Sequence, residues 1–162
     1  MRTQQTQLKG PSRIPSDPLQ RAWIALGRVS QSIREEVGLA LKKAKLPDIT
    51  WYTVLWELER AGKPTRPKDL AIPLFILPYQ LSRLVDRMEE EGLVKRISCP
   101  EDKRGHLLEL TPEGDEMRKR MWTVYAPAMD EAMKRIGDAE ALQLAQLLNK
   151  LGGLDYPVPP RS

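Results

Sequence analysis

The sequence predicts a mainly helical fold with one small β-hairpin, on the strength of three observations. Most apolar residues recur at steps of three and four, which is the period of an amphipathic helix. One interval, 93–110, instead holds two short β-compatible runs around a polar segment that contains Pro100 and Gly105. The chain has 162 residues, of which 41% are hydrophobic and 30% charged, and this balance suits one globular domain.

Six helices can be placed from the apolar spacing. The longest comes first and has Leu26, Ile33 and Leu41 among its apolar positions. Boundary residues support the helix ends, because Gly92 is a suitable stop for the fourth helix and Thr111 a suitable N-cap for the fifth. The expected helices cover approximately 19–44, 48–60, 66–74, 78–91, 112–136 and 138–151.

The hairpin is expected between the fourth and fifth helices. The runs 93–98 and 106–110 are its expected strands, and the polar segment CPEDKRG between them is its expected turn. This turn would present Asp102, Lys103 and Arg104 at the tip. A turn has no structural need for such a charge cluster, so it is either solvated surface or a contact with an anionic partner.

The order helix, short helix, turn, helix, hairpin is typical of a winged helix-turn-helix, whose last helix can lie in a DNA major groove. The expected inward face of that helix consists of Leu81, Leu84, Val85 and Met88. Its polar donors gather at the N-terminal end, whereas the acidic run 89–91 lies at the C-terminal end. Because phosphate attracts the donors and repels the acids, this helix would enter a groove N-terminus first.

Charge alone does not decide between DNA binding and a solvated surface. The net charge is +4, but from Lys63 to Leu110 nine Lys or Arg residues stand against eight Asp or Glu residues. The polar face of the fourth helix alone is equally compatible with ordinary solvated surface. The hairpin favours DNA, because Lys103 and Arg104 could reach phosphates or a narrow minor groove, with Asp102 orienting Arg104.

The segment LSRLVDRMEEEGLVKRISCPEDKRGHLLELTPEG, residues 81–114, resembles the MarR family of bacterial transcriptional regulators. The matching pieces are the Ser-Arg-Leu-Val-Asp-Arg start, Gly-Leu-Val followed by Arg96, the wing Asp-Lys-Arg-Gly, and Leu-Thr-Pro-Glu-Gly. The flanking helices occur where the family has them, so the resemblance covers about 19–152. A run of this length in the right context is a specific signal.

The resemblance implies a homodimer that binds a pseudo-palindromic double-stranded DNA operator as a sequence-specific regulator, acting as a ligand-responsive repressor. Its dimerisation helices would be about 19–44 and 112–152, and its DNA-binding lobe about 48–111. A flexible arm (1–18) and a flexible tail (153–162) are expected outside them. The expected DNA contacts are Pro78, Tyr79, Gln80, Ser82, Arg83 and Arg87 on the recognition helix, and Asp102, Lys103 and Arg104 on the wing.

Four aromatic residues, Trp23, Trp51, Tyr52 and Trp56, crowd the first two helices. They are explained either by core and dimer packing or by a pocket for an aromatic or phenolic effector, of the kind that MarR-like regulators often have. A competing function is a protein–protein interaction module that uses the winged helix as a scaffold and binds no DNA. Salt dependence separates the two functions, because only DNA binding should weaken steeply with salt.

Other functions find little support in the sequence. No Ser/His/Asp set, glycine-rich phosphate loop or carboxylate pair indicates an enzyme, and no cofactor is expected. His106, the single histidine, and Cys99, the single cysteine, do not make a metal set. An ordinary wing cysteine is favoured over a redox sensor, because Glu101 and Asp102 oppose thiolate formation. No apolar run reaches the ~18 residues of a membrane span, and the single cysteine fits a cytoplasmic protein.

Overall fold

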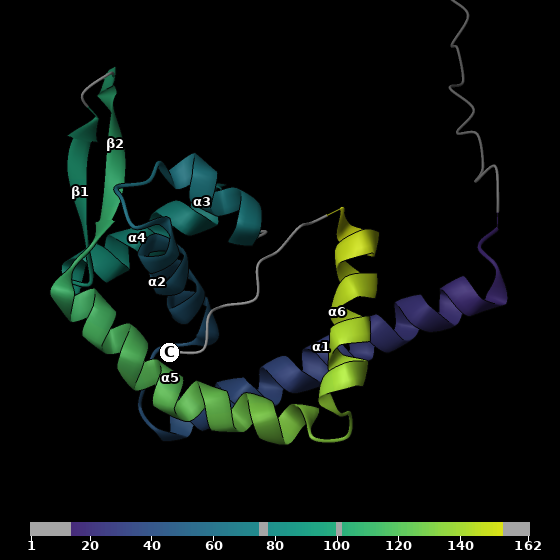
Figure 1. Ribbon diagram of the computed structural model, residues 1–162. Coiled ribbons are helices and arrows are strands. Elements are labelled where there is room, and N and C mark those ends of the chain that lie inside the picture. The colour runs from purple at the N-terminus through teal and green to yellow at the C-terminus, as the bar shows by residue number, and fades with distance from the viewer. Residues whose placement is uncertain (1–13, 75–77, 100–101, 154–162) are drawn as a thin grey trace, which may run out of the picture.

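The computed structural model describes residues 14–74, 78–99 and 102–153, and it confirms the mainly helical fold with one hairpin (Figure 1). The helix α1 begins two residues earlier than expected, since Pro18 is tolerated in a first helical turn. Of the expected N-terminal arm, residues 1–13 lie outside the described residues, as does 154–162 of the expected tail. The elements are α1 (Asp17–Lys43), α2 (Ile49–Ala61), α3 (Pro67–Leu74), α4 (Pro78–Glu90), β1 (Val94–Cys99), β2 (Asp102–Leu110), α5 (Pro112–Met133) and α6 (Asp138–Gly152).

The helix boundaries follow from local hydrogen bonds. The Asp48 carboxylate accepts a hydrogen bond of 2.7 Å from the backbone N–H of Thr50 and so caps α2. The Thr111 hydroxyl accepts one of 3.0 Å from the Gly114 N–H and donates one of 2.6 Å to the carbonyl of Gly92. Gly92 has a φ of +73°, which a residue with a side chain rarely adopts, and it ends α4 as expected. Thr111 therefore caps α5 and ties its start to the end of α4.

The winged lobe is built from α2, α3, α4 and the hairpin around one apolar core. Thr65, in the turn before α3, exchanges backbone hydrogen bonds of 2.9 and 2.8 Å with Leu108 of β2. This bridge fixes the base of the hairpin to the helices. The core side chains of the lobe are Val54, Leu55, Leu58, Leu70, Leu81, Leu84, Val85, Met88, Leu93, Val94 and Leu108.

The hairpin is longer and its turn shorter than the sequence predicts. The strands pair antiparallel from Val94 with Leu110 out to Ser98 with His106, and after a local irregularity Cys99 pairs with Asp102. The residues 102–104 thus belong to β2 and not to the turn, which corrects the expectation. The pairing of Cys99 with Asp102 beyond the irregularity extends β2 past the point where apolar alternation stops.

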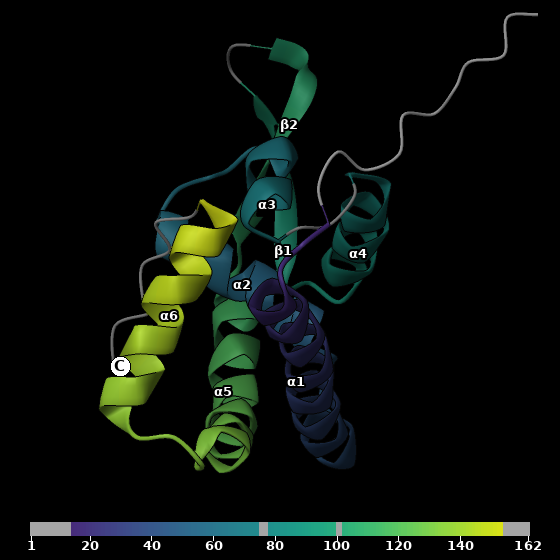
Figure 2. The ribbon, with the colours of Figure 1, turned by 90° about the vertical axis from the view of Figure 1, so that its right-hand side faces the viewer.

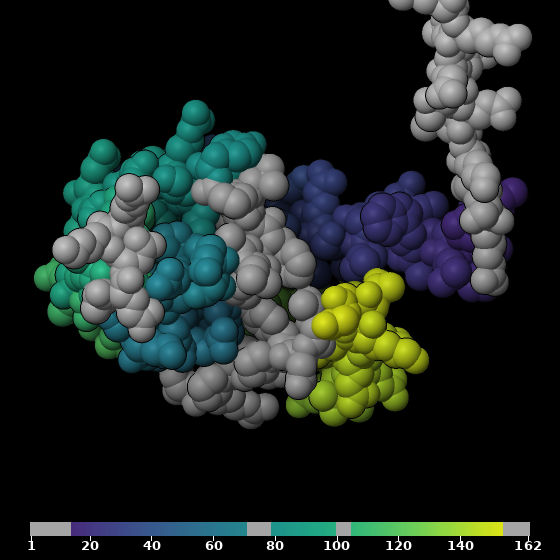
Figure 3. Space-filling view, turned by 90° about the horizontal axis from the view of Figure 1, so that it is seen from above, coloured from purple at the N-terminus to yellow at the C-terminus, as the bar shows by residue number. Residues whose placement is uncertain are grey.

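The helices α1 and α5 lie side by side along one edge of the molecule, and α5 also packs on α2 (Figures 1 and 2). Only the C-terminal part of α1 is buried in this contact, through Val37 and Leu41. The N-terminal half of α1 extends well beyond the lobe, as the purple end of the space-filling view shows (Figure 3). The helix α6 contains no buried residue. Within the described residues, no helix combines the length and apolarity of a membrane span.

Candidate nucleic-acid interface

The helix α4 has one buried and one exposed face, as the sequence predicts. Leu81, Leu84, Val85 and Met88 are buried in the lobe. On the opposite face, Tyr79 is 60% exposed, and Gln80, Ser82 and Arg83 are exposed beside it. The side chain of Pro78 lies outside the described residues. The N-terminal half of α4 therefore presents hydrogen-bond donors to solvent, and one of them, Ser82, lines a small cavity together with His106 of the hairpin.

The two arginines of α4 differ in what surrounds them. The Arg87 guanidinium lies over the Trp51 ring of α2, 6.0 Å from its centroid, in a cation–π contact. Arg83 has no hydrogen bond or ion pair with any residue that the structure describes. Arg83 is therefore free to reach an external partner, whereas Arg87 already has an interaction within the lobe.

The acidic end of α4 is bound to the wing. Arg96 of β1 forms ion pairs with Asp86 and Glu89, and the backbone N–H of Arg96 also donates to Glu89 at 3.1 Å. Burial disfavours the Arg96 charge, but the hydrogen bonds with the two carboxylates outweigh it and raise the pKa of Arg96 above its usual value. Sequence reasoning did not find this network. Its signal was an acidic pair three residues apart, followed by an arginine on the next element.

This arrangement of helices and hairpin is also found in known proteins. Residues 46–105 match the model of the MarR family. The structure is similar to that of Sco3205, a MarR family transcriptional regulator from Streptomyces coelicolor, in complex with DNA. The match has a TM-score of 0.77 and 26% sequence identity, and it covers 91% of this chain and 94% of that chain. The segment 46–105 thus matches the MarR family, and the chain as a whole has the fold of the solved MarR family regulators.

Two further structures support the assignment of the fold. A cysteine-to-serine mutant of MarR from E. coli, complexed with operator DNA, is 26% identical over 83% of this chain and 94% of that chain, with a TM-score of 0.71. The transcriptional regulator BldR from Sulfolobus solfataricus shares the fold at 22% identity over 85% of this chain and 96% of that chain, with a TM-score of 0.74. The MarR winged-helix fold thus extends along most of the chain.

The structure describes the wing only in part. The backbone of Asp102, Lys103 and Arg104 runs in β2, but their side chains lie outside the described residues. Cys99, at the end of β1, is buried, and its sulfur accepts a hydrogen bond of 3.4 Å from the Arg66 guanidinium. A redox sensor needs an accessible thiol, so this burial favours the structural interpretation of Cys99.

The four aromatic residues proposed for an effector pocket lie in different surroundings. Tyr52 is buried against α5, with its ring centroid 5.9 Å from that of Trp122 and 4.9 Å from that of Tyr125. Burial raises the pKa of both Tyr52 and Tyr125, so both phenols stay neutral near pH 7. Trp51 and Trp56 are half-buried, and each lies beside an arginine.

Trp23 is 77% exposed on the projecting half of α1. A single subunit therefore gives the four rings three kinds of environment, and an effector site made by them stays a prediction.

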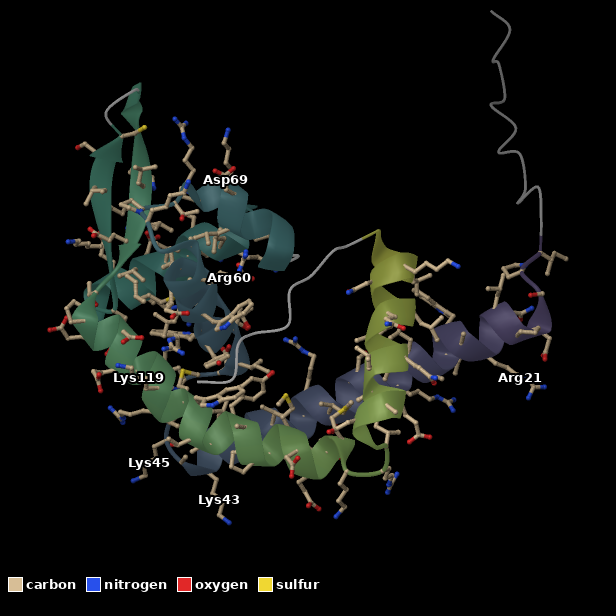
Figure 4. All side chains as sticks on the ribbon, viewed as in Figure 1. Arg21, Lys43, Lys45, Arg60, Asp69 and Lys119 are labelled. Atoms are coloured by element: carbon tan, nitrogen blue, oxygen red, sulfur yellow. The ribbon has the colours of Figure 1, made fainter. Side chains whose placement is uncertain are left out.

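Some basic side chains lie away from α4. Lys43 and Lys45, at the end of α1, and Lys119 of α5 project from the edge of the molecule opposite to the wing (Figure 4). Lys119 pairs there with Asp115 at 2.8 Å and Glu116 at 3.1 Å. In the described part of the chain, no group of three or more His, Cys, Asp or Glu side chains is placed to hold a metal ion.

Proposed function

We propose that this protein is a sequence-specific regulator of transcription that binds double-stranded DNA through α4. The observation that carries the proposal is the exposed N-terminal half of α4, with Tyr79, Ser82 and Arg83 open to solvent. An α-helix fits the major groove, and arginine is the commonest reader of guanine there. DNA is present in the structures of Sco3205 and of the E. coli MarR mutant, which supports the same partner here.

The proposed regulator acts as a homodimer on a pseudo-palindromic operator. The apolar side chains of α6 support this, because a helix that buries none of them gains no stability from packing. A second copy of the chain would cover this face, and two lobes would then address two half-sites. The exposed large apolar residues in question are Leu142, Leu144, Leu147, Leu148 and Leu151 on α6, with Leu19, Trp23, Ile24 and Val29 on α1.

We propose that the regulator works in the cytoplasm as a repressor released by an aromatic or phenolic effector. Tyr52 carries this part of the proposal, because it joins the lobe to α5 through its contacts with Trp122 and Tyr125. A ligand that displaces these rings, with Trp51, Trp56 or Trp23 contributing, would change the spacing of the two lobes and so weaken operator binding. Titration with a panel of phenols and benzoates against the bound duplex tests this, and unchanged affinity throughout would remove the effector from the proposal.

The wing is proposed to contact the minor groove through Arg104, with Lys103 on the phosphates and Asp102 orienting Arg104. Arg104→Ala should then weaken DNA binding without affecting folding. Asp102→Ala separates orientation from simple charge, because loss of a negative charge near DNA should otherwise strengthen binding. Fluorescence anisotropy across a salt series measures both variants. Tighter binding by Asp102→Ala at every salt concentration would contradict the orienting role.

The decisive experiment is selection of bound duplexes from a random pool, followed by a salt series on the selected sequence. DNA binding predicts an enriched pseudo-palindrome and an affinity that falls with a log–log slope of about −0.9 per neutralised phosphate. Replacing Lys43 and Lys45, which face away from the wing, should leave that slope unchanged and serves as the control. If no duplex is enriched, the protein–protein interaction module becomes the better explanation.

A further inference from the structure

A small cavity lies between α4 and the hairpin, with a volume of about 150 Å³. This is about five times the liquid volume of one water molecule, so the cavity has room for a phosphate group. It opens between the two elements that the proposed function places against DNA. Its lining residues are Pro67 of α3, Ser82 and Val85 of α4, Arg96 of β1 and His106 of β2.

The position of His106 follows from strand alternation. Leu108, two residues further along β2, is completely buried and lies opposite Arg96 on the inner face of the hairpin. His106 points to the same face and pairs with Ser98. On the inner face of β2, the apolar residue Leu108 lies in the core, and the polar residue His106 lies one step closer to the hairpin tip. His106 shares the cavity with Ser82.

Two polar groups of this cavity have unused hydrogen-bonding capacity. Among the residues that the structure describes, the Ser82 hydroxyl and the His106 imidazole have no hydrogen bond or ion pair. Arg96 is different, because Asp86 and Glu89 hold its guanidinium. The cavity thus combines a wall fixed by ion pairs with two donors that have no internal partner.

We propose that Ser82 and His106 together bind a phosphodiester of the DNA backbone, and that protonation of His106 strengthens this contact. The inference rests on the proposed function and adds a pH dependence to it. A protonated imidazole donates from both nitrogens, and a charge-assisted hydrogen bond to phosphate is about twice as strong as a neutral one. DNA binding would therefore favour the protonated form and weaken as the pH rises.

The charges around the cavity are consistent with a single titrating group. Arg96 lines the same cavity from β1, and the two carboxylates of α4 that hold it, Asp86 and Glu89, exceed its charge by one, so the fixed wall adds no net positive charge. His106 is the only histidine of the chain, so no other imidazole can change charge between about pH 5 and pH 8. Other charged groups nearby along the chain are Arg104, two residues before His106 in β2, Arg83, next to Ser82 on α4, and Arg66 and Lys68, on either side of Pro67 at the start of α3.

The test measures affinity for the selected duplex by anisotropy between about pH 5.5 and about pH 8, at constant ionic strength and with untagged protein. Wild-type affinity should fall about three- to tenfold over this range. His106→Gln keeps a donor but not the charge, so its affinity should not vary with pH. His106→Lys should bind tightly throughout. Ser82→Ala should bind more weakly at every pH while retaining the dependence.

The salt series gives an independent measurement. At the lower pH the log–log slope of wild-type binding should be steeper by up to about 0.9 per half-site, and His106→Gln should lack this difference. A pH-independent wild type, or a His106→Gln variant that keeps the pH dependence, would overturn the inference while the proposed function stands. Absence of duplex binding at every pH would overturn both. Thermal unfolding of each variant checks that the exposed His106 site leaves the fold intact.

Discussion

The winged lobe and the helices α1, α5 and α6 use their apolar residues in different ways. In the lobe, the inward side chains of α2, α4 and the hairpin meet each other, and residues such as Leu55, Met88 and Leu108 are completely buried. In α6 five leucines are exposed, and in α1 only Val37 and Leu41 are buried. The lobe is thus a finished core within one chain, whereas α1 and α6 leave apolar side chains exposed.

The helix α5 contains both behaviours. Its N-terminal half carries Met121, which is completely buried, and Trp122, which packs on Tyr52 of the lobe. Further along, Met129 is exposed. One continuous helix thus has a core residue in its first half and an exposed apolar residue in its second, because burial depends on what lies opposite each turn.

The largest expected effect is on the proposed dimer. Leu147→Glu combined with Leu151→Glu places two charges on the apolar face of α6 and should cost more than about 4 kcal/mol of association free energy. Sedimentation should then detect monomers at micromolar concentration. Gln146→Glu, on the same helix, adds a charge at an already polar position and is the control. Persistence of the dimer in the double variant would place the interface elsewhere.

The second effect tests the junction between the lobe and α5. A Cβ on Gly114 would lie 2.0 Å from the carbonyl oxygen of Leu93, so a backbone must move. Gly114→Ala should lower the free energy of unfolding by about 2–4 kcal/mol. Gly38→Ala, in the C-terminal part of α1 with no atom within 4 Å of its added Cβ, should be neutral or stabilising by about 0.5–1 kcal/mol. Denaturant unfolding measures both, and equal destabilisation would refute the distinction.

The third effect separates the two arginines of α4. Arg83→Ala should weaken specific DNA binding by about 1–3 kcal/mol and non-specific binding by less. Arg87→Ala should cost less specificity, since Arg87 already contacts Trp51. Affinities for the selected duplex and for a scrambled one measure both variants. Equal losses on the two duplexes would make Arg83 a phosphate contact only.

The smallest effect concerns acid stability at the start of α5. Hydrogen bonds from Lys119, and then Arg118, lower the pKa of Asp115 despite some burial. This contribution is present above the unfolded-state pKa of about 3.9 and disappears as the pH falls through the lower folded-state value. In the Asp115→Asn variant the free energy of unfolding should therefore fall less steeply in acid than in the wild type. The difference should be less than about 1 kcal/mol. Unfolding curves recorded from neutral pH down to about pH 2 should reveal it, and identical curves would contradict it.

The order of the helices, the hairpin and the inward face of α4 could all be read from the sequence, because each depends on local periodicity and on boundary residues such as Asp48, Gly92 and Thr111. The same information placed Ser82 and Arg83 on the exposed face of α4. It did not separate Arg83 from Arg87, since both occupy polar positions of one helix.

The tertiary structure decided what each of those side chains meets. It placed Arg87 over Trp51, bound Arg96 to the acidic end of α4, and brought His106 to Ser82 across a cavity. It also ended the hairpin turn at Asp102 and buried Cys99 beside Arg66. Periodicity fixes which face of an element is apolar, but the crossing of elements distant in sequence sets which polar groups are paired and which stay free.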